Sequence, residues 1–342
     1  MLELNLNLPL ALPPHESTNA SGKQRPIKDY YTGKELYELG VKKIPMLVEG
    51  LFLKTGIMVL AGSSDVGKST LARQLILSIA GDRKQFLGWN LNLKYNKAIY
   101  VSTEDDSIAI SYALNKTVKD EIEKNHLDNI RYVFDSTKLL TKLEAMLKKE
   151  PVDCIVIDAF ADIYDGELNQ LNKVRSFLSN FFNLVERHGV LIIFVHHTGK
   201  RTEALPPSKN NLIGSQGIEG RARQVIELRM DPLDSNFRHL CLVKGNFIPE
   251  EEKKSSYKLK FNEDLSFEMT GERTDFNDLA IIPEKKNRAK IEQTEKIVKL
   301  IEEDKLTFEQ AAKELTKEGK KIGKSTVNNI YRKYNENKSQ HS

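Results

Sequence analysis

Residues 62–69 read GSSDVGKS, which matches the G-x-x-x-x-G-K-[ST] spacing of a phosphate-binding loop. An apolar run, IMVLA, precedes the loop, and residues 70–80 have the composition of a helix. Glycines let backbone N–H groups converge on phosphate oxygens at a helix N-terminus, while the lysine reaches the terminal phosphates and the serine hydroxyl ligates Mg²⁺. The spacing therefore predicts a site for ATP and Mg²⁺ formed by Gly62, Ser63, Ser64, Asp65, Val66, Gly67, Lys68, Ser69 and Thr70.

Two further apolar runs end in carboxylates. The run CIVID ends in Asp158, which suits a Mg²⁺-associated aspartate at the carboxyl edge of a sheet. The run IYVSTEDD brings Glu104 to a strand end, where a glutamate can polarise an attacking water. Its neighbours Asp105 and Asp106 are expected to cap a helix or to stay solvated. The alternative for Glu104 and for Asp158 is the same plain capping role.

Two adjacent histidines, His196 and His197, follow the apolar run VLIIFV. We expect the pair to sense the γ-phosphate through a hydrogen bond, with a structural histidine as the alternative. Metal binding is disfavoured, because two neighbouring histidines without a third ligand make a poor site. Residues 200–217 are long for a simple connection and contain Lys200, Arg201 and Lys209, which indicates a functional or mobile loop that lines a polynucleotide channel.

The elements that must position these groups are short apolar runs at residues 56–61, 97–102, 153–158 and 190–196. Segments with helical spacing, such as residues 139–149 and 174–187, lie between the later runs. Continuously apolar strands that alternate with amphipathic helices indicate an α/β fold with a mainly parallel sheet covered on both faces. After residue 225 the strands alternate, and SYKLKF and LSFEM predict an antiparallel hairpin at the edge of the sheet.

Changes in composition suggest the domain boundaries. Residues 1–34 lack periodicity and predict a flexible leader, so the ATP-binding domain is expected over 35–271. A polar stretch punctuated by Pro283 predicts a linker over 272–287. Residues 288–342 predict a small all-helical module of three helices. A capping box over residues 307–310 opens the second helix, and Ser325 is expected to cap the third.

Charge is concentrated in that last module. From residue 285 to the end there are fifteen Lys and Arg against nine Asp and Glu, so this segment has a net charge of +6. The whole chain has a net charge of +4, so the remainder carries about −2. Three helices with a glycine-containing turn before the last resemble a helix-turn-helix, whose final helix meets duplex DNA. The expected DNA contacts there are Lys324, Asn328, Asn329 and Arg332. A three-helix module that docks another protein is the alternative.

Composition excludes several classes of protein. Hydrophobic residues make up 39% and charged residues 29% of the 342 residues, which excludes disorder throughout. The two cysteines are too few for a disulfide framework and fit a reducing cytoplasm. No apolar run is long enough to span a membrane, and the first residues lack the features of a signal peptide, so we expect a cytoplasmic protein without a membrane partner.

The series GSSDVGKST, YVSTEDD, CIVID, VHHTGK and GSQGIEGRARQVIEL resembles the RepA-type hexameric replicative helicases of broad-host-range plasmids and their RecA-like P-loop ATPase relatives, over residues 40–250. The resemblance implies that Glu104 is the catalytic glutamate, that His197 contacts the γ-phosphate region and that Arg223 is an arginine finger for the neighbouring subunit. Lys244 in LVKGNF resembles the basic finger of DnaB-like rings, although Asn246 occupies the second basic position of that pair. The chain departs from the plasmid helicases after about residue 271.

These features predict an ATP-hydrolysing, ring-forming DNA helicase or translocase, active in the replication or mobilisation of a plasmid or other mobile element. A single strand is expected in the ring channel and duplex DNA at the C-terminal module. The second hypothesis is an ATP-switched DNA-binding regulator or loader that does not unwind. A small-molecule kinase is disfavoured, because the histidine pair, the finger region and the basic tail have no role in it.

Overall fold

In a computed structural model of the chain, the described residues are 16–18, 24–26, 30–119, 121–199, 202–280, 284–317 and 322–339. The chain divides into two compact units, Met1–Ala280 and Ile281–Ser342.

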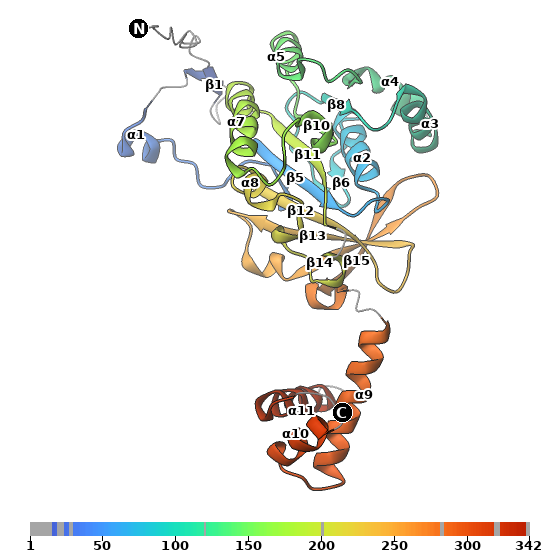
Figure 1. Ribbon diagram of the computed structural model, residues 1–342. Helices are drawn as coiled ribbons and strands as arrows, with labels where there is room; N and C mark the ends of the chain where they lie inside the picture. Colours follow the sequence, from blue (N-terminus) through green and yellow to red (C-terminus); the bar gives the residue numbers. More distant parts are fainter. Residues whose placement is uncertain are drawn as a thin grey trace, which may run out of the picture. The chain divides into compact units, whose positions relative to one another are not determined.

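The first unit is built on a nine-stranded sheet with the order β15-β14-β13-β12-β5-β11-β10-β8-β9 (Figure 1). The six strands from β12 to β9 in this order run parallel, and β13, β14 and β15 extend the sheet antiparallel. The predicted fold, a mainly parallel sheet with an antiparallel edge hairpin, is confirmed. The strands are β5 (Gly56–Gly62), β8 (Ala98–Ser102), β9 (Ile130–Val133), β10 (Cys154–Asp158), β11 (Leu191–His197), β12 (Gln224–Met230), β13 (Phe237–Gly245), β14 (Ser255–Phe261) and β15 (Phe267–Asp275).

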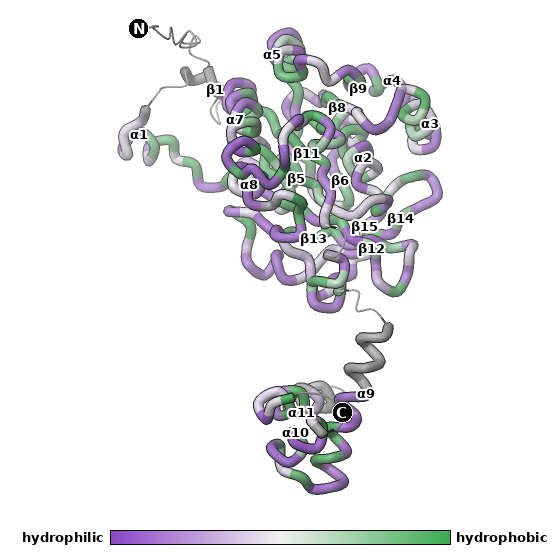
Figure 2. Tube along the Cα trace, viewed as in Figure 1, coloured by the Kyte–Doolittle hydropathy of each residue, from purple (hydrophilic) through white to green (hydrophobic). Residues whose placement is uncertain are grey.

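The central strands form because almost every residue in them is apolar and can be buried on one face or the other. All residues of β5, β8 and β10 are buried, which is why Figure 2 shows hydrophobic colour along the middle of the unit. Alternate residues of β5 enter two separate cores, Met58 and Leu60 on one face and Ile57 and Val59 on the other. The sheet is therefore held from both sides.

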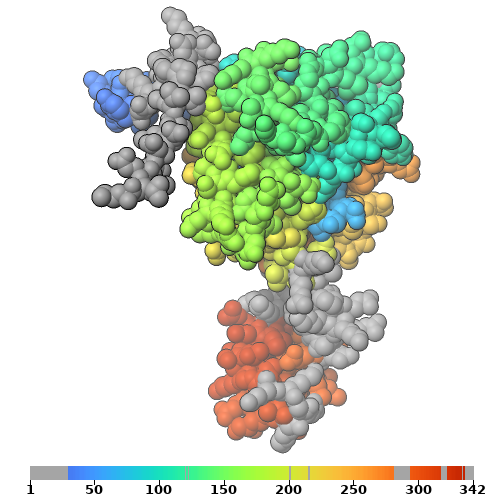
Figure 3. Space-filling model, turned by 45° about the horizontal axis from the view of Figure 1, so that its top comes forward, coloured from blue at the N-terminus to red at the C-terminus, as the bar shows by residue number. Residues whose placement is uncertain are grey.

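Helices cover these two faces. The helix α2 (Lys68–Ala80) packs on the first core through Leu71, Leu75 and Ile79. The helices α5 (Leu139–Lys149) and α7 (Leu171–His188) pack on the second core. The segments from α3 to α7 form much of the face of this unit that is turned to the viewer in Figure 3.

Shorter elements complete the first unit. The short helices are α1 (Gly33–Glu38), α3 (Ser107–Thr117), α4 (Glu121–Asn125), α6 (Phe160–Ile163) and α8 (Ser215–Glu219), with 3-10 turns η1 (Leu127–Asn129), η2 (Thr202–Ala204), η3 (Lys209–Asn211), η4 (Glu250–Lys253) and η5 (Phe276–Leu279). The short strand pairs are β1 (Glu16–Thr18) with β2 (Gln24–Pro26), β3 (Met46–Val48) with β4 (Phe52–Leu53), and β6 (Gln85–Phe86) with β7 (Trp89–Asn90). Among the described residues no helix is long and apolar enough to cross a membrane.

The predicted leader contains structure that its sequence did not indicate. The strands β1 and β2 pair antiparallel, and α1 begins inside the predicted leader at Gly33. Thr32 and Glu35 form a capping box, in which the Thr32 side chain accepts from the Glu35 N–H and the Glu35 carboxylate accepts from the Thr32 N–H. This pattern was present in the sequence, but the helix is only six residues long and shows no periodicity.

The predicted linker over residues 272–287 is wrong at both ends. The strand β15 continues to Asp275, and η5 buries Phe276 and Leu279 against Cys241. Burial of these two apolar side chains holds residues 272–280 in the first unit. The helix α9 (Glu284–Glu302) then begins directly after Pro283, inside the predicted linker.

The second unit contains α9, α10 (Phe308–Lys317) and α11 (Lys324–Ser339) around a small core. The core contains Ile297, Ala311, Ala312, Leu315 and Val327. Thr307 and Gln310 form the expected capping box at the start of α10. The expectation that Ser325 caps the third helix is wrong, because α11 already includes Lys324.

Candidate nucleotide site

The phosphate-binding loop lies between β5 and α2, as its spacing predicts. Gly67 has φ +97°, a left-handed conformation that favours glycine, and it directly precedes α2. The Lys68 ammonium donates to the Ser63 carbonyl at 2.6 Å, across the mouth of the loop. Burial lowers the pKa of Lys68, while the charges of Asp158, Glu104 and Asp65 oppose that effect. The lysine is thus placed where phosphate oxygens can replace its carbonyl partner.

The antiparallel extension holds this loop from behind. The Arg238 guanidinium donates to the Val66 carbonyl at 2.9 Å. The Gln74 side chain makes two hydrogen bonds to the backbone of Phe267, at 2.8 and 2.9 Å. A Cβ placed on Gly67 would lie 2.8 Å from the Phe267 ring, so the loop and the hairpin are in close contact. Sequence reasoning missed these supports, because nothing in the chain order relates β13 and β15 to the loop.

Asp158 ends β10 and is 4% exposed. Its Oδ2 accepts a hydrogen bond from the Tyr100 hydroxyl at 2.5 Å, while its Oδ1 is buried and has no hydrogen-bond partner among the described residues. Burial, followed by the charge of Asp158, raises the pKa of Tyr100 well above its ordinary value. The sequence offered one signal for Tyr100, because a tyrosine in a fully buried strand needs a partner for its hydroxyl.

Glu104 and His197 meet at the same edge of the sheet. Glu104 Oε1 lies 3.5 Å from His197 Nε2, and the Glu104 side chain is half-exposed. Asp105 instead pairs with Arg73 at 3.1 Å. Asp106 accepts from the N–H groups of Ile108 and Ala109 and caps α3. The capping role expected for this acidic run is therefore confirmed for Asp106, and it leaves Glu104 facing the loop edge.

The two histidines separate, because successive side chains of a strand point to opposite faces. His196 is 1% exposed, and its Nε2 lies 2.8 Å from the Ile213 carbonyl. The centre of its ring lies 5.4 Å from the centre of the Phe160 ring, and the two ring planes are nearly perpendicular. Burial lowers the pKa of His196 to about 4. The structural alternative therefore describes His196, and only His197 faces the phosphate side.

A buried polar cluster anchors the loop that follows the histidines. Glu227, which is 1% exposed, accepts from the Ser208 N–H, from the Asn211 side chain and from the Arg229 guanidinium. Arg229 also donates to the carbonyls of Thr202 and Leu205, both at 2.6 Å. These contacts hold residues 202–211 in place, which argues against mobility in this part of the loop.

The groups at the carboxyl edge fit a Mg²⁺–nucleotide. A Mg²⁺ ion keeps several waters and takes one or two protein oxygens together with phosphate oxygens. Ser69 lies next to Lys68 in α2, and the unpartnered Asp158 Oδ1 is an acceptor suited to the water shell of the ion. No group of three or more His, Cys, Asp or Glu that could hold a metal alone occurs in the described part of the chain. The site therefore suits a metal that arrives with phosphate.

Arg223 lies at the opposite edge of the sheet. Its N–H donates to the carbonyl of Ile57, which lies five residues before Gly62 in β5. At 3.3 Å per residue, this is roughly 17 Å from the start of the loop. The Arg223 guanidinium lies 5.6 Å from the centre of the Phe182 ring, and that of Arg221 lies 5.8 Å from it. Both arginines are exposed.

Several basic residues expected to contact ligands are paired within the chain. The ammonium of Lys244 donates to the Glu219 carbonyl, and burial lowers the pKa of Lys244. Lys209 lies 2.7 Å from the Glu219 carboxylate. Lys200 and Arg201 lie outside the described residues. In α11, the residues expected at DNA, Lys324, Asn328, Asn329 and Arg332, are all exposed.

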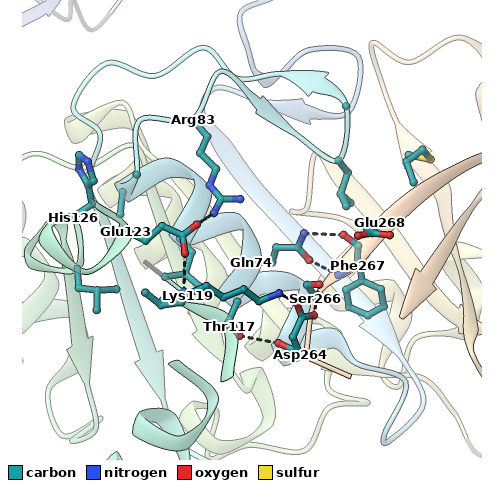
Figure 4. A pocket seen from close by; sticks show the side chains of 18 residues that line it. Gln74, Arg83, Thr117, Lys119, Glu123, His126, Asp264, Ser266, Phe267 and Glu268 are labelled. Carbon is teal, nitrogen blue, oxygen red and sulfur yellow. Dashed lines mark hydrogen bonds and ion pairs between the residues drawn. The ribbon is translucent and has the colours of Figure 1, made fainter. Parts of the chain in front are cut away.

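A separate hollow of about 860 Å³ lies beside the C-terminal half of α2 (Figure 4). The residues that line it include two ion pairs, Arg83 with Glu123 and Lys119 with Asp264. None of Lys68, Asp158 and Glu104 lines this hollow, so it is distinct from the phosphate site.

The first unit has the fold of the RecA-type ATPases, and its loop has the spacing of a phosphate-binding loop. A family model described as an AAA domain matches residues 42–203. Among solved structures, the chain is similar to the ATPase domain of G40P, at 14% sequence identity and a TM-score of 0.53 over 69% of this chain and 95% of that one. It is also similar to a KaiC-like protein from the archaeon Pyrococcus horikoshii, at 18% identity and a TM-score of 0.47 over 65% of this chain and 93% of that one. None of the curated proteins compared with the sequence matches it significantly.

The buried His196 makes the stability of the first unit depend on pH. Between its ordinary pKa of about 6.5 and its folded value of about 4, the unfolded chain binds a proton that the folded chain does not. The free energy of unfolding has its full value above about pH 6.5. It decreases as the pH is lowered, by about 3 kcal/mol at pH 4. Urea unfolding at pH 7, 6 and 5 should show a flatter dependence for His196→Gln, which keeps an N–H donor for Ile213.

The matched control is His126→Gln, at a half-exposed position, which should leave the pH dependence of the wild type unchanged. Parallel pH profiles for the wild type and His196→Gln would show that His196 does not carry this effect.

Proposed function

We propose that this protein is an ATP-hydrolysing ring motor, a DNA helicase or translocase of the RepA type that assembles as a hexamer. The observation that carries the proposal is that the candidate site residues lie at two opposite edges of one sheet. Lys68, Asp158 and Glu104 gather at the carboxyl edge, whereas Arg223 stands exposed at the amino edge. A head-to-tail ring would bring the second edge of one subunit to the first edge of the next.

The chemistry follows from the carboxyl edge. Lys68 and the backbone N–H groups of the loop would bind the β- and γ-phosphates, and Ser69 and Asp158 would hold Mg²⁺, which would supply positive charge to neutralise the developing negative charge. Glu104 accepts a proton from the attacking water. At the same time the water oxygen bonds to the γ-phosphorus, and the bond between that phosphorus and the ADP oxygen breaks. His197 stands beside Glu104 and would donate a hydrogen bond to the γ-phosphate.

Arg223 would act in the site of the neighbouring subunit. A guanidinium supplied from another subunit stabilises the charge that builds up on the transferred phosphoryl group. The Phe182 ring and the close backbone at Gly56 support the side chain at this edge, since a Cβ on Gly56 would lie 3.3 Å from the Arg223 Cδ. Lys244 is a weaker candidate for the same role, because Glu219 already pairs with it.

The second unit would bind duplex DNA. Val327 faces its core, whereas Thr326, Asn328 and Asn329 are exposed on α11, as the final helix of a helix-turn-helix requires. Asparagine can contact adenine through two hydrogen bonds in the major groove. We place the protein in the replication or mobilisation of a plasmid or other mobile element, on the strength of the sequence resemblance.

The second unit also favours an alternative function. A separate helical unit with its own core and an exposed polar helix suits an ATP-switched DNA-binding regulator or loader. Strand displacement by the purified protein separates the two functions, because a regulator would bind DNA and hydrolyse ATP slowly without displacing a strand.

Lys68→Ala and Glu104→Gln should have different effects. Lys68→Ala removes a charge that meets phosphate and should weaken Mg-ATP binding at least about tenfold. Glu104→Gln should keep that affinity and lower turnover by about 10²-fold or more, because only the proton acceptor is lost. Binding is measured with a fluorescent nucleotide and turnover by phosphate release. Glu263→Gln, the same change in an exposed turn, is the control. Wild-type turnover in Glu104→Gln would move the base to Asp105.

Mixing of variants should show that Arg223 acts in trans. Arg223→Ala and Glu104→Gln subunits are each expected to be inactive alone. Mixed oligomers should recover part of the ATPase rate, because some interfaces pair an intact Glu104 with an intact Arg223. Arg221→Ala, whose side chain also lies over Phe182, is the matched control and should remain active alone. No recovery in oligomers of proven mixed composition would place Arg223 outside the site.

Loss of the second unit should reduce DNA recruitment and spare basal ATP hydrolysis. A chain that ends at Ala280 should bind duplex DNA more weakly than the full chain at low salt, with unchanged ATPase rate in the absence of DNA. Within the full chain, Lys324→Ala should weaken binding more than Lys305→Ala, a change of the same charge in the exposed turn between α9 and α10. Equal duplex binding by the full and shortened chains would replace the DNA-binding role with protein docking.

A further inference from the structure

The two oxygens of Asp158 have different surroundings. Oδ2 accepts a hydrogen bond from the Tyr100 hydroxyl at 2.5 Å, and Oδ1 is buried without a partner among the described residues. The strands β8 and β10 run parallel with Tyr100 opposite Val156, two residues before Asp158. Side chains two residues apart in a strand share a face, so the phenol and the carboxylate meet on the same side of the sheet.

We propose that Tyr100 is a positioning residue for the metal site: its hydroxyl holds one oxygen of Asp158 and thereby presents the other to the water shell of Mg²⁺. The inference rests on the proposed role of Asp158 in Mg²⁺ binding.

The physical reason is that a carboxylate rotates easily about its last torsion unless one oxygen is held. Tyr100 is fully buried, and its ring packs 5.6 Å from the ring of Tyr132, so the donor has a fixed position. The hydrogen bond also satisfies a buried charge that would otherwise lack a partner on that side. Partners of this kind orient metal-binding groups, and their loss typically weakens metal binding about tenfold or more.

A purely structural role for Tyr100 makes a different prediction. A buried apolar strand would pack equally well with phenylalanine, whose ring has the same shape without the hydroxyl. The neighbouring Tyr132 shows the contrast, because its hydroxyl is also buried but has no hydrogen-bond partner among the described residues. Tyr132→Phe is therefore a matched control for Tyr100→Phe.

The test uses the full chain and a fluorescent ADP analogue, whose affinity is measured in EDTA and at increasing Mg²⁺ concentration. Tyr100→Phe should bind the analogue in EDTA as the wild type does, but should need about tenfold more Mg²⁺ to reach half of the metal-dependent gain in affinity. Tyr132→Phe should match the wild type in both measurements. Thermal unfolding in EDTA, recorded for both variants, reports on the integrity of the fold separately from metal binding.

Asp158→Asn separates this inference from the proposed function. If Asp158→Asn shifts the Mg²⁺ midpoint and Tyr100→Phe does not, the inference fails and the role of Asp158 stands. If neither variant shifts the midpoint, the proposed role of Asp158 fails and the inference fails with it. Weaker binding by Tyr100→Phe in EDTA, with an unchanged Mg²⁺ midpoint, would likewise overturn the inference, because it would show a structural role.

Discussion

The phosphate loop must keep its backbone N–H groups free for a ligand, and this constraint shapes the rest of the first unit. A loop whose N–H groups are kept for a ligand has to be held through its carbonyls and by close packing. The Arg238 guanidinium donates a hydrogen bond to the Val66 carbonyl, and the Lys68 ammonium donates one to the Ser63 carbonyl. A Cβ on Gly62 would lie 2.5 Å from the Leu228 carbonyl oxygen, so β12 leaves no space beside the loop. The antiparallel extension is therefore part of the nucleotide site, although none of its residues has to touch phosphate.

The strand order then decides which groups can act together. The strands β5, β11, β10 and β8 are neighbours, and their carboxyl ends bring Lys68, His197, Asp158 and Glu104 to one edge of the sheet. The strand β12 runs parallel to β5, so it begins at the opposite edge of the sheet. In the proposed ring, Arg223 would therefore complete the site of a neighbouring subunit, and this separation is the physical argument for that proposal.

Buried polar groups give the site its fixed geometry. Glu227, Arg229 and Asn211 satisfy one another and hold the loop after His197 close to β12. Ile213 in turn meets both histidines through its backbone, because its carbonyl lies beside the His196 ring and its N–H donates to the His197 carbonyl at 3.3 Å. The buried hydrogen bonds of Glu227 with Asn211 and Arg229 favour one arrangement over its competitors.

The sequence alone determined the phosphate loop, the carboxylates at strand ends and the parallel sheet, because these features lie in short contiguous patterns. The spacing around Lys68 and the apolar runs before Glu104 and Asp158 contain their own structural context. Only the tertiary structure decided which histidine faces the phosphate, which carboxylate oxygen is held by Tyr100, and that Arg229 is buried while Arg223 is exposed. It also moved the end of the first unit to Ala280, because Phe276 and Leu279 pack against Cys241. Each of these outcomes depends on contacts between residues far apart in the chain, and side-chain spacing within one element does not encode them.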